Sequence, residues 1–228
     1  MSGHHLLEMT DLHYAPSPDR VLFDGAALAV HQDDRIGLWA DNGMGKTSLL
    51  RILTGLLKPQ SMKLMLEGEP IVDEEGFKRV RRRFGYVLQN ADDQLFFPEV
   101  IDDVMFGPLN LGMSSREAYA AAEETLRTLG IFELRHSETR SLSGGQKRLV
   151  SIASILAMHP TGLLLDEPTS GLDEKARERL IGILNGLPGP RLIVSHDREF
   201  LLAVSQRLVG ISSGHLVPFN FSEDGHFH

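Results

Sequence analysis

The chain has 228 residues, a formal net charge of −8 at pH 7 and no cysteine. The length suits the core of one large α/β domain, and the absence of cysteine excludes disulfides and thiolate metal sites and fits a cytosolic protein. The acidic balance argues against a nucleic-acid partner, and there is neither a run of 18 apolar residues nor a signal peptide, so no membrane span is predicted.

A glycine-rich loop in the first quarter of the chain has the pattern of a phosphate-binding loop. We expect residues 1–35 to form a small antiparallel sheet and the apolar run 36–39 to be a buried strand. Residues 40–47 then read Ala-Asp-Asn-Gly-Met-Gly-Lys-Thr, and an apolar-rich helix is predicted near 45–55. Strand, glycine-rich turn and helix are the order that a phosphate loop requires. An ordinary glycine-rich turn is the alternative, and Ala40 stands where the pattern has its first glycine.

Two residues of this loop have the chemistry to hold a nucleotide. Glycines let backbone N–H groups point at phosphates, and the N-terminus of a helix favours negative charge. We therefore expect Lys46 to contact the β- and γ-phosphates and the Thr47 hydroxyl to bind Mg²⁺.

A basic cluster and a long helical region follow. Residues 78–83 carry five basic side chains, and we interpret them as a solvated helix face with local charge pairing. The strand 84–88 then ends at Gln89. Ser114 or Ser115 is a suitable N-cap for a helix through about Leu129. The apolar or small face of that helix comprises Ala118, Ala122, Leu126 and Leu129.

Residues 142–146 read Leu-Ser-Gly-Gly-Gln and open a predicted helix that runs to about Met158. Ser143 is a good N-cap. Two glycines weaken a first turn without an evident structural gain, which favours a bare helix end that a γ-phosphate can approach. A plain capped helix after a loop is the alternative.

Two adjacent carboxylates follow the apolar run 162–165, which is typical of a central parallel strand. Ligands of open α/β sheets bind beyond the carboxyl ends of strands. We therefore expect Asp166 to hold Mg²⁺ and Glu167 to polarise an attacking water. Alternation along the strand would place the two side chains on opposite sides and so favours different roles. The alternative is a solvated strand end before Pro168.

The remaining patterns complete the predicted sheet and its helices. The parallel strands are expected at 36–39, 84–88, 162–166, 191–195 and 207–212. Further helices are expected at 174–186 and 197–204. The stretch 90–160 lacks a buried-strand pattern, and no internal repeat or low-complexity linker is visible.

Together these motifs resemble the nucleotide-binding domain of ATP-binding cassette (ABC) proteins, and the resemblance covers essentially the whole chain. It implies an α/β fold of the P-loop NTPase class, with an ABC-type core sheet, a small N-terminal antiparallel β-subdomain and a helical subdomain inserted at approximately 90–160. Residues 1–228 would then be a single nucleotide-binding domain. The resemblance also implies ATP and Mg²⁺ as cofactors and a site that a second copy of the chain completes.

The same resemblance assigns roles to individual residues. Gln89 would contact Mg²⁺ and the attacking water, and His196 the γ-phosphate. The nucleotide loop would comprise Ala40, Asp41, Asn42, Gly43, Met44, Gly45, Lys46, Thr47 and Ser48. The partner copy would supply Ser143, Gly144, Gly145, Gln146 and Asp173. Tyr14 is the nearest candidate for stacking on adenine, although it stands about two positions early and Pro16 is closer to the expected place. A strand tyrosine packed on the sheet edge is the alternative.

The helical region narrows the resemblance. Residues 89–96 read Gln-Asn-Ala-Asp-Asp-Gln-Leu-Phe, and with 100–103 and 106–112 they look like the ATPases of energy-coupling-factor transporters, notably the cobalt and nickel branch. This implies an ATP-hydrolysing subunit at the cytoplasmic face of the membrane. Its partners would be a transmembrane coupling subunit, a solute-binding membrane subunit and a second ATPase subunit, as a homodimer or with a different ATPase. Gln94, Phe96, Phe97 and Phe106 would receive a helix of the coupling subunit, unless some of them are core.

Several functional alternatives stay open. The solute could be a vitamin such as biotin instead of a metal ion, or the chain could serve a lipid, efflux or cell-division ABC system. An ABC ATPase that acts on ribosomes or DNA is less favoured, because such proteins usually join two cassettes or insert long coiled coils. The terminal histidines could relay metal ions, but chain ends are usually disordered; they are His4, His5, His226 and His228.

Overall fold

The computed structural model describes residues 5–221, and two β-sheets organise this part of the chain. The first is an antiparallel sheet with the strand order β2-β1-β4-β5. Its strands are β1 (Leu7–Tyr14), β2 (Phe23–Val30), β4 (Ser61–Leu66) and β5 (Glu69–Pro70). The first two confirm the antiparallel sheet predicted within residues 1–35. The other two join it from beyond the phosphate loop and were not predicted.

The second sheet has the strand order β10-β9-β3-β8-β7-β6. Its strands are β3 (Arg35–Trp39), β6 (Phe84–Val87), β7 (Gly162–Asp166), β8 (Arg191–Val194), β9 (Arg207–Ser212) and β10 (His215–Phe219). The five strands from β9 to β6 are parallel, as predicted. β10 pairs antiparallel with β9 at the edge, an addition that the sequence patterns did not indicate.

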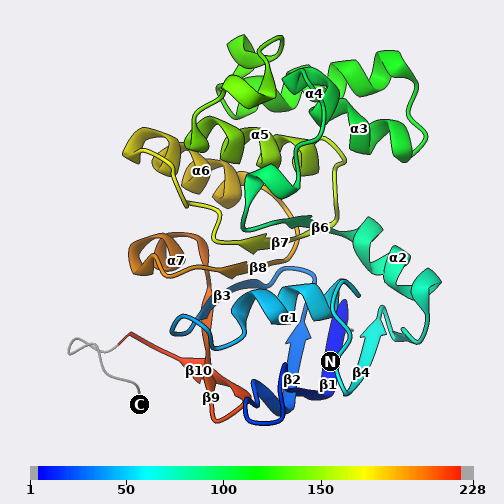
Figure 1. Cartoon of the computed structure of the whole chain (residues 1–228), viewed down its shortest axis with the longest axis vertical. Helices are drawn as coiled ribbons and strands as arrows, with labels where there is room; N and C mark the ends of the chain where they lie inside the picture. The colour runs from blue at the N-terminus through cyan, green and yellow to red at the C-terminus, as the bar shows by residue number, and fades with distance from the viewer. Residues whose placement is uncertain (1–4, 222–228) are drawn as a thin grey trace.

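Seven α-helices and three short 3₁₀ helices complete the described part of the chain. The α-helices are α1 (Lys46–Leu53), α2 (Glu74–Arg83), α3 (Val100–Asn110), α4 (Ser115–Thr128), α5 (Gly144–Leu156), α6 (Glu174–Gly186) and α7 (Arg198–Val204). The 3₁₀ helices are η1 (Ala91–Asp93), η2 (Phe132–Leu134) and η3 (Thr139–Ser141). Figure 1 shows α3, α4 and α5 gathered at one end of the molecule and the antiparallel sheet at the other.

The parallel sheet lies between two hydrophobic cores. Successive residues of β7 illustrate this, since Leu164 belongs to the core shared with α1 and the antiparallel sheet, and Leu165 to the core shared with α5, α6 and α7. Leu192 and Ile193 of β8 divide in the same way. Both faces are therefore covered, which explains why these strands are continuous apolar runs.

Two helix starts confirm the predicted capping. The Ser114 side chain accepts the N–H of Glu117, whose carboxylate accepts the N–H of Ser114, so this serine, and not Ser115, caps α4. Ser143 and Gln146 form the same reciprocal pair at α5. Capping boxes of this kind satisfy donors that a helix start leaves free. The predicted apolar face of α4 is also confirmed, because all four of its residues are buried.

The basic cluster is the solvated, locally paired face of α2 that the sequence predicts. Each of four basic side chains forms an ion pair with a glutamate on or near the helix, and these pairs are Lys78–Glu75, Arg79–Glu69, Arg81–Glu74 and Arg83–Glu67. All are partly exposed, and such pairs contribute little to stability.

Two predictions concern the chain ends and membrane spans. His4, His226 and His228 lie outside the described residues, so their metal-relay role stays untested. His5 is described, and its ring contacts that of His31. Within residues 5–221, none of the helices has both the length and the apolar content to cross a bilayer.

Candidate nucleotide site

The carboxyl ends of four neighbouring parallel strands meet at one edge of the second sheet. β3, β8, β7 and β6 lie side by side, so the segments that follow them are brought together. A cavity of about 480 Å³ opens there. It is lined by Pro16, Arg20, Leu22, Asn42, Gly43, Gly45, Lys46, Thr47, Ser48, Gln89, Asp166 and Glu167. Most of the residues predicted to hold nucleotide and Mg²⁺ therefore share one cavity.

The loop after β3 has the geometry of an anion cradle. Gly43 and Gly45 adopt φ values of 83° and 98°, a left-handed conformation that other residues rarely adopt. Gly45 is the N-cap of α1, so the N-terminus of this helix faces the cavity. Lys46 is only 8% exposed, and its Nζ donates to the carbonyls of Ala40 at 2.5 Å and Asp41 at 3.2 Å. The ammonium group is therefore held over the loop.

Ala40 replaces the first glycine of the pattern without disturbing this loop. It is 3% exposed and belongs to the core cluster that contains α1 and the antiparallel sheet. Its carbonyl still accepts the Lys46 ammonium. The additional methyl group is thus accommodated by apolar packing and the loop keeps its main-chain contacts.

Asp166 has the features of a cation ligand. Its side chain is fully buried, and burial raises the pKa of its carboxyl. Oδ2 lies 3.5 Å from the Tyr86 hydroxyl, whereas Oδ1 has no hydrogen-bond partner within the described chain. Nearby, the Thr47 hydroxyl donates to Oε1 of Gln89 at 3.4 Å. A buried, unpaired carboxylate oxygen beside hydroxyl and amide oxygens is a donor set that fits Mg²⁺.

The backbone at Glu167 does not continue the strand, although the predicted alternation of Asp166 and Glu167 requires it to do so. The strand ends at Asp166, and Glu167 adopts a φ of 48°, a left-handed conformation that is unusual for a residue with a side chain. Strand alternation therefore does not separate the two carboxylates, and both line the same cavity. Such local strain is often found at functional sites.

Glu167 is tied to the segment that follows β8. Its Oε2 accepts the backbone N–H of His196 and the Ser195 hydroxyl, each at 3.2 Å, and lies 2.8 Å from His196 Nδ1. The imidazole is largely exposed, and His196 itself is not among the residues that line the cavity. The structure thus brings together the residues predicted as base and γ-phosphate contact.

The residues assigned to the partner copy lie away from this cavity. Ser143 and Gly144 are exposed at the start of α5, and none of residues 143–146 lines the cavity. Asp173 is the N-cap of α6, where its side chain accepts the N–H of Ala176. One chain therefore presents the two predicted halves of the site on different surfaces.

The two glycines of this motif have different structural reasons. A Cβ on Gly145 would lie 2.6 Å from the carbonyl oxygen of Gly171, so close packing requires this glycine. A Cβ on Gly144 would meet nothing within 4 Å. The inference that the pair brings no structural gain was therefore wrong for Gly145. Of the two, only Gly144 has open space at the position where a side chain would lie.

The adenine prediction falls on a residue outside the cavity. Tyr14 is paired with Phe23 in the antiparallel sheet and packs against the first core cluster, as in the alternative interpretation. Pro16, Arg20 and Leu22 line the cavity beside it, and Arg20 donates to the carbonyl of Gly43 at 2.6 Å. Adenine stacking by Tyr14 stays a prediction. Arg20 and Leu22 belong to no recognisable motif, so the sequence could not predict that they line the cavity.

Two further residues near the site were missed. Tyr86 contacts Asp166, and burial first, then the charge of Asp166, raises the pKa of its phenol. Arg148 is buried in α5 and donates to the carbonyls of Leu88 and Gln89. In the sequence, Tyr86 looks like a strand residue and Arg148 like an exposed helix position, so neither signals its contact.

Comparisons with known proteins agree with this geometry. The family model described as "ABC transporter" matches residues 23–170. The cobalt import ATP-binding protein CbiO of Rhodobacter capsulatus is 46% identical over 85% of this chain and 71% of its own length. The energy-coupling factor transporter ATP-binding protein EcfA of Methanoculleus marisnigri is 43% identical over 93% of this chain and 78% of its own.

Solved structures show the same architecture. CbiO1 of Clostridium perfringens, described as part of the transporter complex CbiONQ, has a TM-score of 0.80 and 29% identity, covering 94% of this chain and 87% of its own. A dimeric ATP-binding cassette bound to ADP and Pi has a TM-score of 0.85 over 95% of this chain and 99% of its own, at 22% identity. These matches confirm the predicted fold class. The chain belongs to the ABC transporter ATPase family, and it is a subunit that binds ATP and couples ATP hydrolysis to transport.

Proposed function

We propose that this ATPase powers an energy-coupling-factor importer whose solute is a transition-metal ion, cobalt or nickel. The similarity to a cobalt import protein at 46% identity and to an EcfA protein at 43% identity is the observation that carries this proposal. The likeness to CbiO1 supports it. A vitamin such as biotin is the second candidate, because the name EcfA specifies no solute.

The site residues support a division of labour in hydrolysis. The loop N–H groups and Lys46 would bind the phosphates, and Thr47, Gln89 and Asp166 would hold Mg²⁺, which supplies charge neutralisation of the phosphates. Glu167 would orient the attacking water and take its proton. His196, next to Glu167, would contact the γ-phosphate. One chain would be a single nucleotide-binding domain with a helical subdomain inserted at approximately 90–160.

The separation of the two half-sites supports a dimer. The cavity holds the phosphate loop and both carboxylates, whereas Ser143, Gly144 and Asp173 lie outside it. In a two-fold dimer the same surface of each copy can complete the site of the other. We propose that ATP is enclosed between two copies of this chain, with Ser143–Gln146 of each copy facing the phosphates held by the other.

An apolar surface along α3 supports a membrane partner. Phe96 is 68% exposed and Phe106 42%, and their ring centroids lie 6.3 Å apart. Phe97 is half-buried against Phe106. Asp103 fixes this turn by accepting the N–H groups of Phe96 at 2.7 Å and Phe97 at 3.1 Å. Exposed apolar patches of this kind usually mark partner sites.

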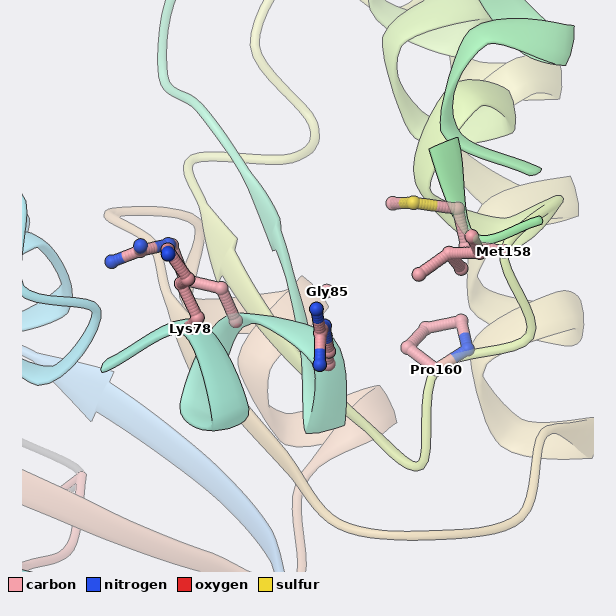
Figure 2. Close-up of a pocket in the computed structure, with 7 residues that line it drawn as sticks. Lys78, Gly85, Met158 and Pro160 are labelled. Carbon is pink, nitrogen blue, oxygen red and sulfur yellow. The ribbon is translucent and has the colours of Figure 1, made fainter. Parts of the chain in front are cut away.

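The patch continues toward a hollow beside α2. Leu109 and Leu111 are exposed at the end of α3, and Leu111 also lines a cavity of about 190 Å³. Figure 2 shows Lys78 of α2 and Gly85 of β6 on one side of this cavity and Met158 and Pro160 on the other. We propose that a cytoplasmic helix of the transmembrane coupling subunit lies along this surface, which would hold the ATPase at the cytoplasmic face of the membrane.

Gln94 does not belong to that apolar surface. Its amide donates to the carbonyl of Ser151 and the hydroxyl of Ser154, so the side chain is used within the chain. The remaining group of Phe96, Phe97 and Phe106 carries the docking proposal.

Reconstitution tests the proposed function. The ATPase, the coupling subunit and the solute-binding subunit would be placed in lipid vesicles, and ATP-dependent uptake of labelled Co²⁺, Ni²⁺ and biotin would be compared. Uptake of a metal ion that requires ATP and intact Lys46 supports the proposal. Uptake of biotin alone would assign the second candidate, and assembly with an exporter in place of these subunits would refute both.

A further inference from the structure

A buried arginine joins helix α5 to the strand exit that carries Gln89. Arg148 is 2% exposed, and its Nη1 donates to the carbonyl of Leu88 at 2.6 Å. Its Nη2 donates to the carbonyl of Gln89. The guanidinium is a planar fork of several donors, so one side chain can bind two successive carbonyls.

Gln94 binds the backbone N–H of the same residue, Leu88. Its Oε1 accepts the N–H of Leu88 at 3.1 Å. Its Nε2 donates to the Ser151 carbonyl at 2.5 Å and to the Ser154 hydroxyl at 2.9 Å, both on α5. The peptide groups at Leu88 are therefore fixed to α5 through both their N–H and their C=O.

The energetics of burial make Arg148 more than a packing residue. Burial lowers the pKa of its guanidinium, and the charges of Asp166 and Glu167 act in the opposite direction. A buried cation without partners is strongly unfavourable, whereas charge-assisted hydrogen bonds to carbonyls compensate it. The guanidinium is therefore held where it binds the two carbonyls and interacts electrostatically with Asp166 and Glu167.

Arg148 and Gln94, with their hydrogen bonds to Leu88 and Gln89, form a clamp. This clamp links Gln89 to the start of α5. Gln89 lines the nucleotide cavity, where its Oε1 accepts the Thr47 hydroxyl. α5 begins at Gly144 and is capped by Ser143, the surface proposed to face the other copy. Arg148 lies in the second turn of the same helix. Movement of α5 must then displace Gln89, and displacement of Gln89 must move α5.

We propose that Arg148 is a positioning residue that makes Gln89 of one ATP site and Ser143–Gln146 of the other move as one body. The inference rests on the proposed two-copy function. It assigns to the clamp the cooperativity between the two ATP sites: closure of one site sets Gln89 in the other.

Two variants weaken the clamp, one at Arg148 and one at Gln94. Arg148→Lys keeps the charge but cannot bond both carbonyls in the same geometry. Gln94→Ala removes the hydrogen bonds from Gln94 to the Leu88 N–H, the Ser151 carbonyl and the Ser154 hydroxyl. Because Gln94 is partly exposed, this variant should lower the stability of the fold less than a substitution at Arg148. Asp92→Asn is the matched control, because it removes only the exposed ion pair of Asp92 with Lys147 between the same two segments.

The first measurement is hydrogen exchange without nucleotide. Peptides covering residues 86–95 should exchange at least about 10-fold faster in Arg148→Lys and Gln94→Ala than in the wild type or in Asp92→Asn. Peptides from α4 should not change. Unchanged exchange at 86–95 in both folded variants would overturn the clamp. This readout needs no ATP, so it does not depend on the proposed function.

The second measurement is the ATP dependence of hydrolysis. The wild type should show a Hill coefficient near 2, whereas both clamp variants should approach about 1 with kcat about 10-fold lower and KM for ATP within about twofold. Asp92→Asn should follow the wild type. Faster exchange with unchanged cooperativity would reduce the clamp to a structural role and overturn the proposal. A wild type without hydrolysis or without cooperativity would instead refute the two-copy function itself.

Discussion

Oε2 of Glu167 lies 2.8 Å from Nδ1 of His196 and also accepts the backbone N–H of the same residue. The predicted base and the predicted γ-phosphate contact are therefore one unit. The backbone at Glu167 is left-handed, and its side chain contacts His196. Because the carboxylate orients the histidine, substitutions at the two positions should be strongly non-additive.

Glu167→Gln should keep ATP binding and lose most turnover. An amide can still accept the His196 N–H, but it cannot take a proton from water, and general bases contribute about 10²–10⁴-fold to rate. With hydrolysis blocked, the ATP-bound dimer should accumulate. Single-turnover hydrolysis and size-exclusion chromatography with ATP measure the two effects. Glu174→Gln, at an exposed position in the first turn of α6, is the control and should retain wild-type rates. A Glu167→Gln variant with near wild-type hydrolysis would remove Glu167 from the base role.

The composite site predicts complementation between two inactive variants. Gly144→Val should fold normally, because a side chain at Gly144 meets open space, but it should block the approach of a partner's nucleotide. Lys46→Ala should lose phosphate binding. A heterodimer of the two has one intact site, formed by Lys46 of one chain and Gly144 of the other. Mixing equal amounts should restore up to about a quarter of wild-type ATPase, since half of the dimers regain one site of two.

The outcome separates a shared site from a site within one chain. If each chain formed its own complete site, both chains of the mixed dimer would stay defective and the mixture would be as inactive as its components. Gly145→Ala is the contrasting variant, because its methyl group would meet the Gly171 carbonyl. It should lower the thermal unfolding midpoint, whereas Gly144→Val should not.

The sequence predicted those parts of the fold whose cause is local. The buried strands β7 and β8 contain continuous apolar runs at 163–165 and 192–194, and α4 has a cap and a periodic face that can be recognised without its neighbours. β4 could not be predicted as a partner of β1, because the choice of an antiparallel partner some 50 residues away depends on packing and not on a local pattern.

The site shows the same division. The phosphate loop, Asp166 and Glu167 were predicted from motifs whose residue types and order follow from the chemistry, whereas Gln89 was predicted only from the family resemblance. The structure brings all of them to one cavity. The left-handed turn at Glu167 and the close approach of Gly145 to Gly171 depend on tertiary contacts. Arg148 is a charged residue in an amphipathic helix, so its sequence position gives no sign that it is buried.

Asp103 provides a prediction about pH. Burial raises the pKa of its carboxyl above 3.8, so the folded state disfavours the charged form. The stability that this group contributes is complete below the pKa of the unfolded chain and is lost as pH rises through the folded pKa. Asp103→Asn stays neutral, its carbonyl can accept the Phe96 and Phe97 N–H groups, and its amide can donate to Thr139.

The expected result is a pH-dependent gain in stability. The unfolding midpoint of Asp103→Asn should match that of the wild type near pH 4 and exceed it by about 2–4 °C at pH 7.5. Calorimetry at several pH values without nucleotide measures the difference. Asp103→Ala should be less stable than the wild type at every pH, because it leaves two backbone N–H groups without partners. A constant difference between Asp103→Asn and the wild type across this range would contradict the assignment.

The last prediction separates docking from folding at the aromatic surface. Phe96→Glu places a charge on a side chain that is 68% exposed, so the free ATPase should fold and hydrolyse ATP within about twofold of the wild type. Assembly with the coupling subunit should weaken at least about 10-fold, since a buried charge without a partner is unfavourable at an interface. Val72→Glu is the matched control: Val72 is 82% exposed and precedes α2 in the chain, outside the segment that carries Phe96, Phe97 and Phe106. Co-purification, basal ATPase and solute uptake would be measured for both variants. Equal loss of assembly in the two variants would show a general effect of charge, and loss of basal ATPase in Phe96→Glu would place this ring in the fold and not in the docking surface.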